Sequence, residues 1–186
     1  MPPTSFKVSF TLDDQDVAYF RGLFRKAKAA ARDASREHIL TGARELIANV
    51  RRTKKTPKFV VGAVEAIEDL VALIEDTDYR APKPVVDQVL AALAYFTEPE
   101  DLIPDNVPVL GFLDDAIMIK FIEREFRHEL AAYRKFKSFR GGAEQRPWTN
   151  IARERLPVRL ESMRRKLREQ IERRRSADES KGLIGF

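Results

Sequence analysis

The chain has 186 residues, of which 44% are hydrophobic and 34% charged, and its formal net charge is +5 at pH 7. This composition predicts a soluble, helix-rich chain with a real core, and eight glycines and ten prolines are too few for a turn-rich β architecture. The absence of cysteine excludes disulfides, thiolate metal sites and cysteine nucleophiles. We find no targeting segment and no run of roughly 20 apolar residues, and we expect a cytoplasmic protein without a membrane span.

The first element that we expect is a short β-strand at residues 5 to 12, "SFKVSFTL". Its apolar residues alternate with polar ones, which is typical of a half-buried strand: Phe6, Val8, Phe10 and Leu12. A lone strand cannot satisfy its own backbone, so it needs the C-terminal tail, a second copy of the chain or another protein. Asp13 or Asp14 then provides an N-cap for a helix.

Apolar residues at three- and four-residue spacing predict helices in the rest of the chain. Their stripes lie at residues 17–31, 39–50, 60–74, 86–96, 119–133 and 156–171. Pro84 suits the first turn of the fourth helix, and the fifth is predicted to be one long helix that ends near "FRGGAEQRPW". We therefore predict an all-α bundle of about five core helices, with the short strand before it and a basic helix after it.

The predicted domain organisation follows from the positions of these elements and of the charges. Residues 1–140 would form the bundle, and residues 141–186 would form a linker and an amphipathic C-terminal helix with its tail. From residue 153 to 175 the chain has ten Arg or Lys against four Glu, whereas residues 84–119 contain seven Asp or Glu and no Lys or Arg. The chain thus has an acidic middle and a basic end.

The basic helix leaves three interpretations open. It is a solvated or oligomeric helix with Glu–Arg pairs, a surface for nucleic acid whose affinity falls with salt, or a surface for an acidic protein or membrane. The residues that would contact nucleic acid or an acidic partner are Arg164, Arg165, Lys166, Arg168, Arg173, Arg174 and Arg175.

Residues 101–116, "DLIPDNVPVLGFLDDA", contain four aspartates, two prolines and a glycine among apolar residues. Pro104 and Pro108 keep the residues before them out of the helical region, and Gly111 allows a positive φ. These three residues would form a structural motif that bends the chain twice between two helices.

The aspartates of this segment have two interpretations. Asp105 suits a turn, while Asp114 or Asp115 would accept hydrogen bonds at the start of the next helix. Alternatively, Asp101 and Asp105 join the later pair in a site for Mg²⁺ or Ca²⁺, which would suit a metal-dependent enzyme. Beyond this divalent cation we expect no cofactor.

The same segment resembles the signature of the YkvA-like family, domain of unknown function 1232. The family pattern is close to D-x-I-P-D-x-x-P-x-x-G-x-x-D-D followed by an apolar helix. The matching positions are Asp101, Ile103, Pro104, Asp105, Pro108, Gly111, Asp114 and Asp115. The resemblance covers about 40 residues and implies no established activity. Many members look membrane-associated, but here the motif is followed by "KFIEREFRHELAAYRKF", a soluble amphipathic helix.

Other catalytic patterns are weak. Glu125 and His128 form an E-x-x-H pair, as in half of a di-iron site, but a second such pair is missing and we interpret the two as a solvated helix face. The chain has no G-x-S-x-G and no phosphate-binding glycine loop. We expect a protein-interaction or assembly module that binds a protein partner or itself, rather than an enzyme.

Overall fold

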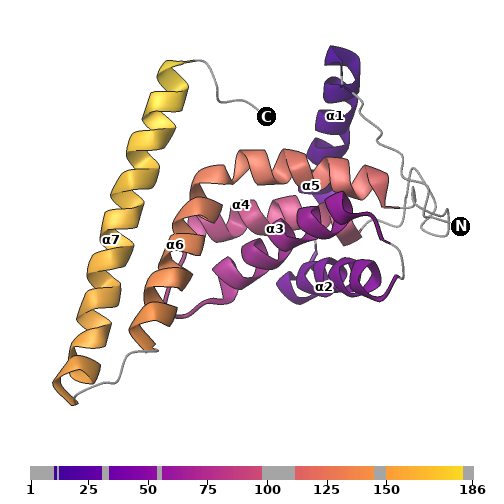
Figure 1. Ribbon diagram of the computed structural model, residues 1–186. Coiled ribbons are helices and arrows are strands. Elements are labelled where there is room, and N and C mark those ends of the chain that lie inside the picture. The colour runs from indigo at the N-terminus through magenta and orange to yellow at the C-terminus, as the bar shows by residue number, and fades with distance from the viewer. Residues whose placement is uncertain are drawn as a thin grey trace, which may run out of the picture.

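The computed structural model describes Thr11 and residues 13–30, 34–53, 56–97, 112–144 and 150–181. Every regular element in these residues is helical, which confirms the all-α prediction (Figure 1). The elements are α1 (Asp14–Ala30), α2 (Arg36–Arg52), α3 (Lys58–Glu75), α4 (Lys83–Leu93), the 3-10 helix η1 (Ala94–Thr97), α5 (Leu113–Glu125), α6 (Arg127–Glu144) and α7 (Asn150–Ser180). The strand predicted at residues 5 to 12 lies outside the described residues except for Thr11, which belongs to no element.

Several helices begin where their sequences favour a start. The Asp13 carboxylate accepts hydrogen bonds from two backbone N–H groups of the next turn, at 2.8 and 2.9 Å, so Asp13 caps α1 as predicted. The Ser35 hydroxyl accepts from the backbone N–H of His38 at 3.2 Å and caps α2. Pro84 lies in the first turn of α4, which also confirms its predicted place.

Helix α3 lies in the middle of the bundle and packs against α2, α5 and α6. Half of its 18 residues are buried, and Ile67, Leu70 and Leu73 are completely inaccessible. Helices α1, α2 and α4 meet around η1. Gly42 of α2 makes this possible, because a Cβ atom there would lie only 2.6 Å from Thr97 Cγ2.

The prediction of one long fifth helix is wrong. The structure divides it at Phe126 into α5 and α6, which point in different directions (Figure 1). Phe126 has φ −95° and ψ 18°, just outside the helical region, and its ring is buried. Neither proline nor glycine lies at this point, and the buried ring of Phe126 anchors the chain in the core where its direction changes.

Helix α7 lies beside α6 and runs in the opposite direction along one edge of the molecule (Figure 1). Leu160 and Leu167 of α7 are buried in the same hydrophobic core as the other helices. Helix α6 continues through Gly141 and Gly142 and ends at Glu144, within the segment where the sequence predicted the end of this helix. The basic C-terminal helix is therefore packed on the bundle through one side that includes Leu160 and Leu167.

Candidate interaction surface

Most of the predicted motif lies outside the described residues: Asp101, Pro104, Asp105, Pro108 and Gly111. Asp114 and Asp115 are described and occupy the first turn of α5. The helix begins just before them, with Phe112 as the N-cap residue, so both aspartates lie at the helix start, where the sequence placed them. Their carboxylates still lie where the positive end of the helix dipole favours negative charge.

The metal site predicted from the four aspartates depends on residues that the structure does not describe. Among the described ranges, no group of three or more His, Asp or Glu side chains is arranged to hold a metal ion. Asp114 itself is buried, with 5% of its surface exposed, between the core-facing residues of α5. The divalent cation and the enzyme that would use it stay predictions.

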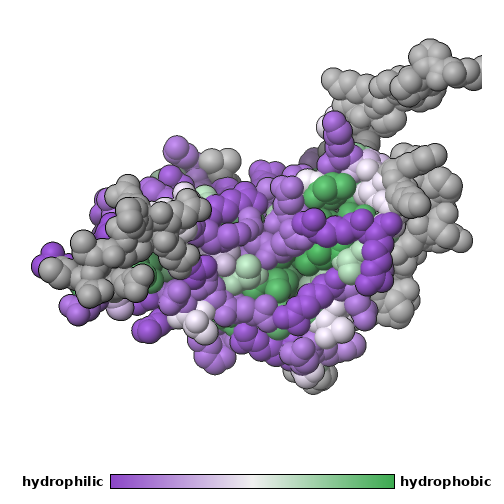
Figure 2. Space-filling view, turned by 60° about the horizontal axis from the view of Figure 1, so that its bottom comes forward, coloured by the Kyte–Doolittle hydropathy of each residue, from purple (hydrophilic) through white to green (hydrophobic). Residues whose placement is uncertain are grey.

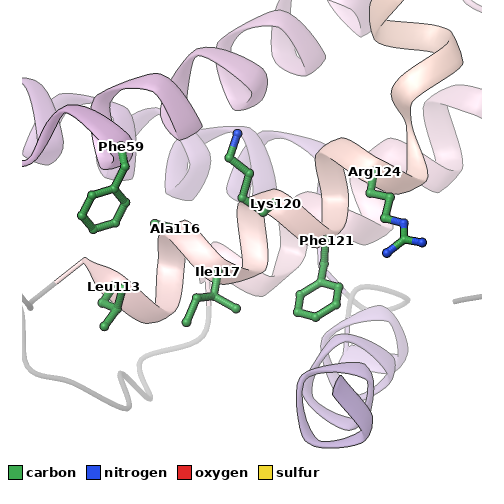
Figure 3. A pocket seen from close by; sticks show the side chains of 7 residues that line it. All are labelled: Phe59, Leu113, Ala116, Ile117, Lys120, Phe121 and Arg124. Atoms are coloured by element: carbon green, nitrogen blue, oxygen red, sulfur yellow. The ribbon is translucent and has the colours of Figure 1, made fainter. Parts of the chain in front are cut away.

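Helix α5 has apolar side chains on two opposite sides. Its inner side buries Met118, Ile119 and Ile122 completely in the core. Its outer side faces an open groove of about 340 Å³ that it shares with the start of α3 (Figure 3). The groove is lined by Phe59, Leu113, Ala116, Ile117, Lys120, Phe121 and Arg124.

The groove is an apolar hollow with basic residues beside it. Phe59 leaves 51% of its surface exposed, an unusual state for a phenylalanine in a bundle of this kind. The ring of Phe121 packs against the ring of Phe20 of α1, with ring centroids 5.7 Å apart. On the face of the molecule shown in Figure 2, hydrophobic residues lie in a hollow between hydrophilic residues.

The two basic residues of the groove differ in their contacts. Lys120 donates to Glu123 at 2.6 Å within α5, an exposed pair of small energetic value. The guanidinium of Arg124 is exposed and makes no ion pair in the described part of the chain. All five other lining residues are apolar, so the groove offers contact area to apolar groups and positive charge to carboxylates.

The predicted basic surface on α7 is in part turned toward the protein itself. Arg164 is buried, donates to the carbonyl oxygen of Asp78 at 2.5 Å and pairs with Glu161. Arg168 donates to the carbonyl oxygen of Arg80 at 2.6 Å. These bonds connect α7 to the turn between α3 and α4.

Two more of the predicted cations have carboxylate partners. Arg175 pairs with Glu129 of α6, and Arg173 lies 3.7 Å from Glu169 within α7. Arg165, Lys166 and Arg174 are exposed and make no ion pair with a described residue. The prediction that α7 binds nucleic acid or an acidic partner therefore depends on these three side chains.

The E-x-x-H residues are not the solvated face that the sequence suggested. Glu125 pairs with Lys28 of α1 at 3.1 Å, and the Nε2 atom of His128 lies 2.6 Å from the Asp178 carboxylate. Only 15% of the His128 side chain is exposed. Hydrogen bonds from His128 and Arg127 hold the pKa of Asp178 below its usual value. Both residues serve contacts between helices.

A second ionic network joins α3 to α6. Burial alone would raise the pKa of Asp76, but hydrogen bonds from Arg140 and from backbone N–H groups lower it below the usual value. The Tyr133 hydroxyl donates to the same carboxylate at 3.2 Å, and burial together with this carboxylate raises the pKa of Tyr133. Burial, assisted by the charge of Glu129, raises the pKa of Tyr79 to about 12. These hydrogen bonds and ion pairs connect the end of α3 to α6, as suits a structural element.

The comparison with protein families confirms the predicted resemblance. Residues 88–121 match the family described as "Protein of unknown function (DUF1232)". The match extends from α4 through η1 and the proline-rich motif into α5, and therefore includes most of the residues that line the groove. No curated protein and no solved structure matches the chain. No helix among the described residues is long and apolar enough to cross a membrane.

The sequence identified the motif but not the groove beside it. A signal was present: the large apolar residues Phe59 and Ile117 lie just before the stripes predicted for their helices, and Phe121 lies within a stripe but off its three- and four-residue spacing. Such residues have no place on the core face of the helix that carries them. Together with the family match, they mark the outer side of α5 as the candidate functional surface.

Proposed function

We propose that this protein is a protein-interaction module, and that the groove along α5 receives apolar side chains of its partner. The observation that carries the proposal is the open apolar hollow of about 340 Å³ between α5 and Phe59. Recognition by a hydrophobic groove is a common way to bind an amphipathic segment of another protein. Apolar anchors in such a groove supply most of the binding energy.

The charges around the groove define the partner further. Lys120 and Arg124 flank the apolar floor, and in the part of the chain that the structure describes no carboxylate lines the groove. A partner segment with carboxylates beside its apolar residues would match this charge distribution, which favours fast and selective association. The partner is therefore expected to be apolar and acidic.

Selection from a display library of random 12-residue peptides tests this proposal without a known partner. We expect the purified chain to enrich peptides that combine aromatic or aliphatic residues with Asp or Glu. The Ile117→Glu variant should lose them, because it places a carboxylate in the groove. The matched control is Val158→Glu on α7, where 71% of the side chain is exposed and the groove is distant, and it should retain them.

Two outcomes would change the conclusion. Enrichment of peptides that bind Ile117→Glu as well as the wild type, or no enrichment at all, would remove the groove as the interaction site. Sedimentation velocity gives the other test: an oligomer of the wild type that Ile117→Glu dissociates would identify the partner as a second copy of this chain.

A further inference from the structure

A second hollow lies between α6 and α7, away from the α5 groove. It has a volume of about 140 Å³ and is bounded by polar side chains from both helices. His128 and Lys135 of α6 are seven residues apart and so lie on one face, and Gln170 and Arg174 of α7 are four residues apart on the facing helix. Leu167 and Ile171 form an apolar floor.

Two cations at this hollow differ from their neighbours. Arg127 and Arg175 also lie on α6 and α7, but they pair with Asp178 and Glu129. Lys135 and Arg174 are exposed and form no ion pair or side-chain hydrogen bond with any described residue. Positive charge therefore collects on the two sides of the hollow without a matching carboxylate.

His128 adds a third nitrogen-bearing group with a fixed orientation. Its Nε2 atom is engaged by Asp178 at 2.6 Å, so the ring is held in place and Nδ1 is the remaining hydrogen-bonding atom. The Asp178 carboxylate that holds this ring also forms an ion pair with Arg127. The side-chain amide of Gln170 provides a further donor.

We propose that this hollow binds the phosphate group of a small phosphate monoester. A phosphate monoester carries between one and two negative charges at neutral pH and three strong acceptor oxygens, which suit Lys135, Arg174 and Gln170 placed on two helices. The partly exposed side chain of Ile171, which lies over the buried Leu167, contacts the organic part of the ligand. A carboxylate has only one charge and two oxygens, so it satisfies this set of donors less well.

Calorimetric titration of the full chain with phenyl phosphate, at constant ionic strength set by chloride, tests the assignment. We expect saturable binding, weaker binding of inorganic phosphate, which lacks the apolar ring, and weaker binding of benzoate. Lys135→Gln and Arg174→Gln should each reduce the affinity roughly tenfold, since each removes a charge-assisted hydrogen bond. The matched controls Arg165→Gln and Lys166→Gln remove exposed cations of α7 outside the hollow and should change nothing.

Several results would overturn the proposal. They are the absence of saturable binding of phenyl phosphate, a loss of affinity in the control variants equal to that in Lys135→Gln and Arg174→Gln, or an affinity for benzoate equal to that for phenyl phosphate. Tighter binding of a single-stranded oligonucleotide that depends on Arg165 and Lys166 would assign α7 to nucleic acid instead. The groove variant Ile117→Glu should bind phenyl phosphate with the affinity of the wild type, so this proposal can be tested independently of the proposed function of the α5 groove. Melting temperatures of the ligand-free variants equal to that of the wild type would show that the substitutions do not unfold the protein.

Discussion

Helices α5 and α7 each differ from what their sequences suggest, and they differ in opposite ways. Helix α7 is strongly basic, and its sequence left open a contact surface for nucleic acid or an acidic partner, yet Arg164, Arg168 and Arg175 bind groups of the same chain. Helix α5 resembles an ordinary core helix in sequence, yet it leaves an apolar groove of about 340 Å³ open on its outer side.

This difference shows that charge density is a poor guide to a free surface. An arginine can cover apolar area with its stem and satisfy carbonyl oxygens with its guanidinium, so a basic helix can be an internal element. An apolar side chain has no such second use, and several exposed apolar side chains gathered in one patch are the more informative sign. The variants described below test whether α7 is packed on the bundle and whether the outer side of α5 is open.

The largest effect is expected at the apolar contact between α7 and the bundle. Leu167 is 1% exposed, and Leu167→Ala should lower the free energy of unfolding by about 3 kcal/mol through lost burial and a residual cavity. Val158→Ala on the same helix, where 71% of the side chain is exposed, should change it by less than about 0.5 kcal/mol. Urea denaturation measures both, and equal effects would mean that α7 is not packed on the bundle.

The next effect concerns the ionic contacts of α7. Arg175→Ala leaves Glu129, whose side chain is 3% exposed, buried without its cation, and should cost about 2 kcal/mol. Arg173→Ala removes an exposed pair with Glu169 at 3.7 Å and should cost at most about 0.5 kcal/mol. If urea denaturation gives the same small cost for both, the arginines of α7 are surface charges, as the sequence had suggested.

These contacts also show what the sequence could predict. The apolar stripes of α2 and α3, the cap at Asp13 and the place of Pro84 follow from local periodicity and backbone chemistry, and the structure confirms them. The family resemblance at residues 101–116 is confirmed for the same reason, since a motif is local.

The features that the sequence did not predict depend on distant neighbours. The backbone N–H of Phe126 still bonds to Ile122 at 2.9 Å and that of Leu130 to Phe126 at 2.8 Å, so the helical periodicity continues through the break between α5 and α6. Likewise, whether Ile117 is covered depends on what α1 and α3 place beside it. Spacing along one helix can show that Ile117 lies off the core stripe, but it shows neither whether another helix covers Ile117 nor where the helix changes direction.

Two glycines test the packing next to the family-matched segment. Gly42→Ala should destabilise the protein by about 1–2 kcal/mol, because the new Cβ would lie 2.6 Å from Thr97 Cγ2 and 2.9 Å from the carbonyl oxygen of Phe96. Gly62→Ala in α3 meets nothing within 4 Å and should stabilise by roughly 0.5–1 kcal/mol through helix propensity. Thermal unfolding compares them, and stabilisation by both variants would show that α2 and η1 are not in close contact.

The ionic network between α3 and α6 should depend on pH. The folded-state pKa of Asp76 lies below the usual 3.8, so its carboxylate stabilises the fold at neutral pH, and this contribution is lost as the pH falls through the folded-state pKa. Asp76→Asn should cost about 1 kcal/mol at pH 7, and the difference from the wild type should shrink below pH 3.8. Asp87→Asn, in an exposed pair with Lys83, is the control. A difference that is constant from pH 7 to pH 3 would contradict the assigned role of Asp76.

The smallest effect on stability is expected at the open helix, and it is the most informative for function. Phe59→Ser removes a ring that is 51% exposed, and it should change the free energy of unfolding by less than about 1 kcal/mol, because the ring loses little burial. The same variant should weaken the peptides selected by the α5 groove at least tenfold, since an apolar anchor contributes more than 1.4 kcal/mol to binding at an interface. Phe136→Leu, a change at a fully buried ring in α6, gives the reverse pattern: lower stability and unchanged peptide affinity. If Phe59→Ser were as destabilising as a core substitution, the aromatic ring would be part of the folded core, and α5 would be as fully packed as α7.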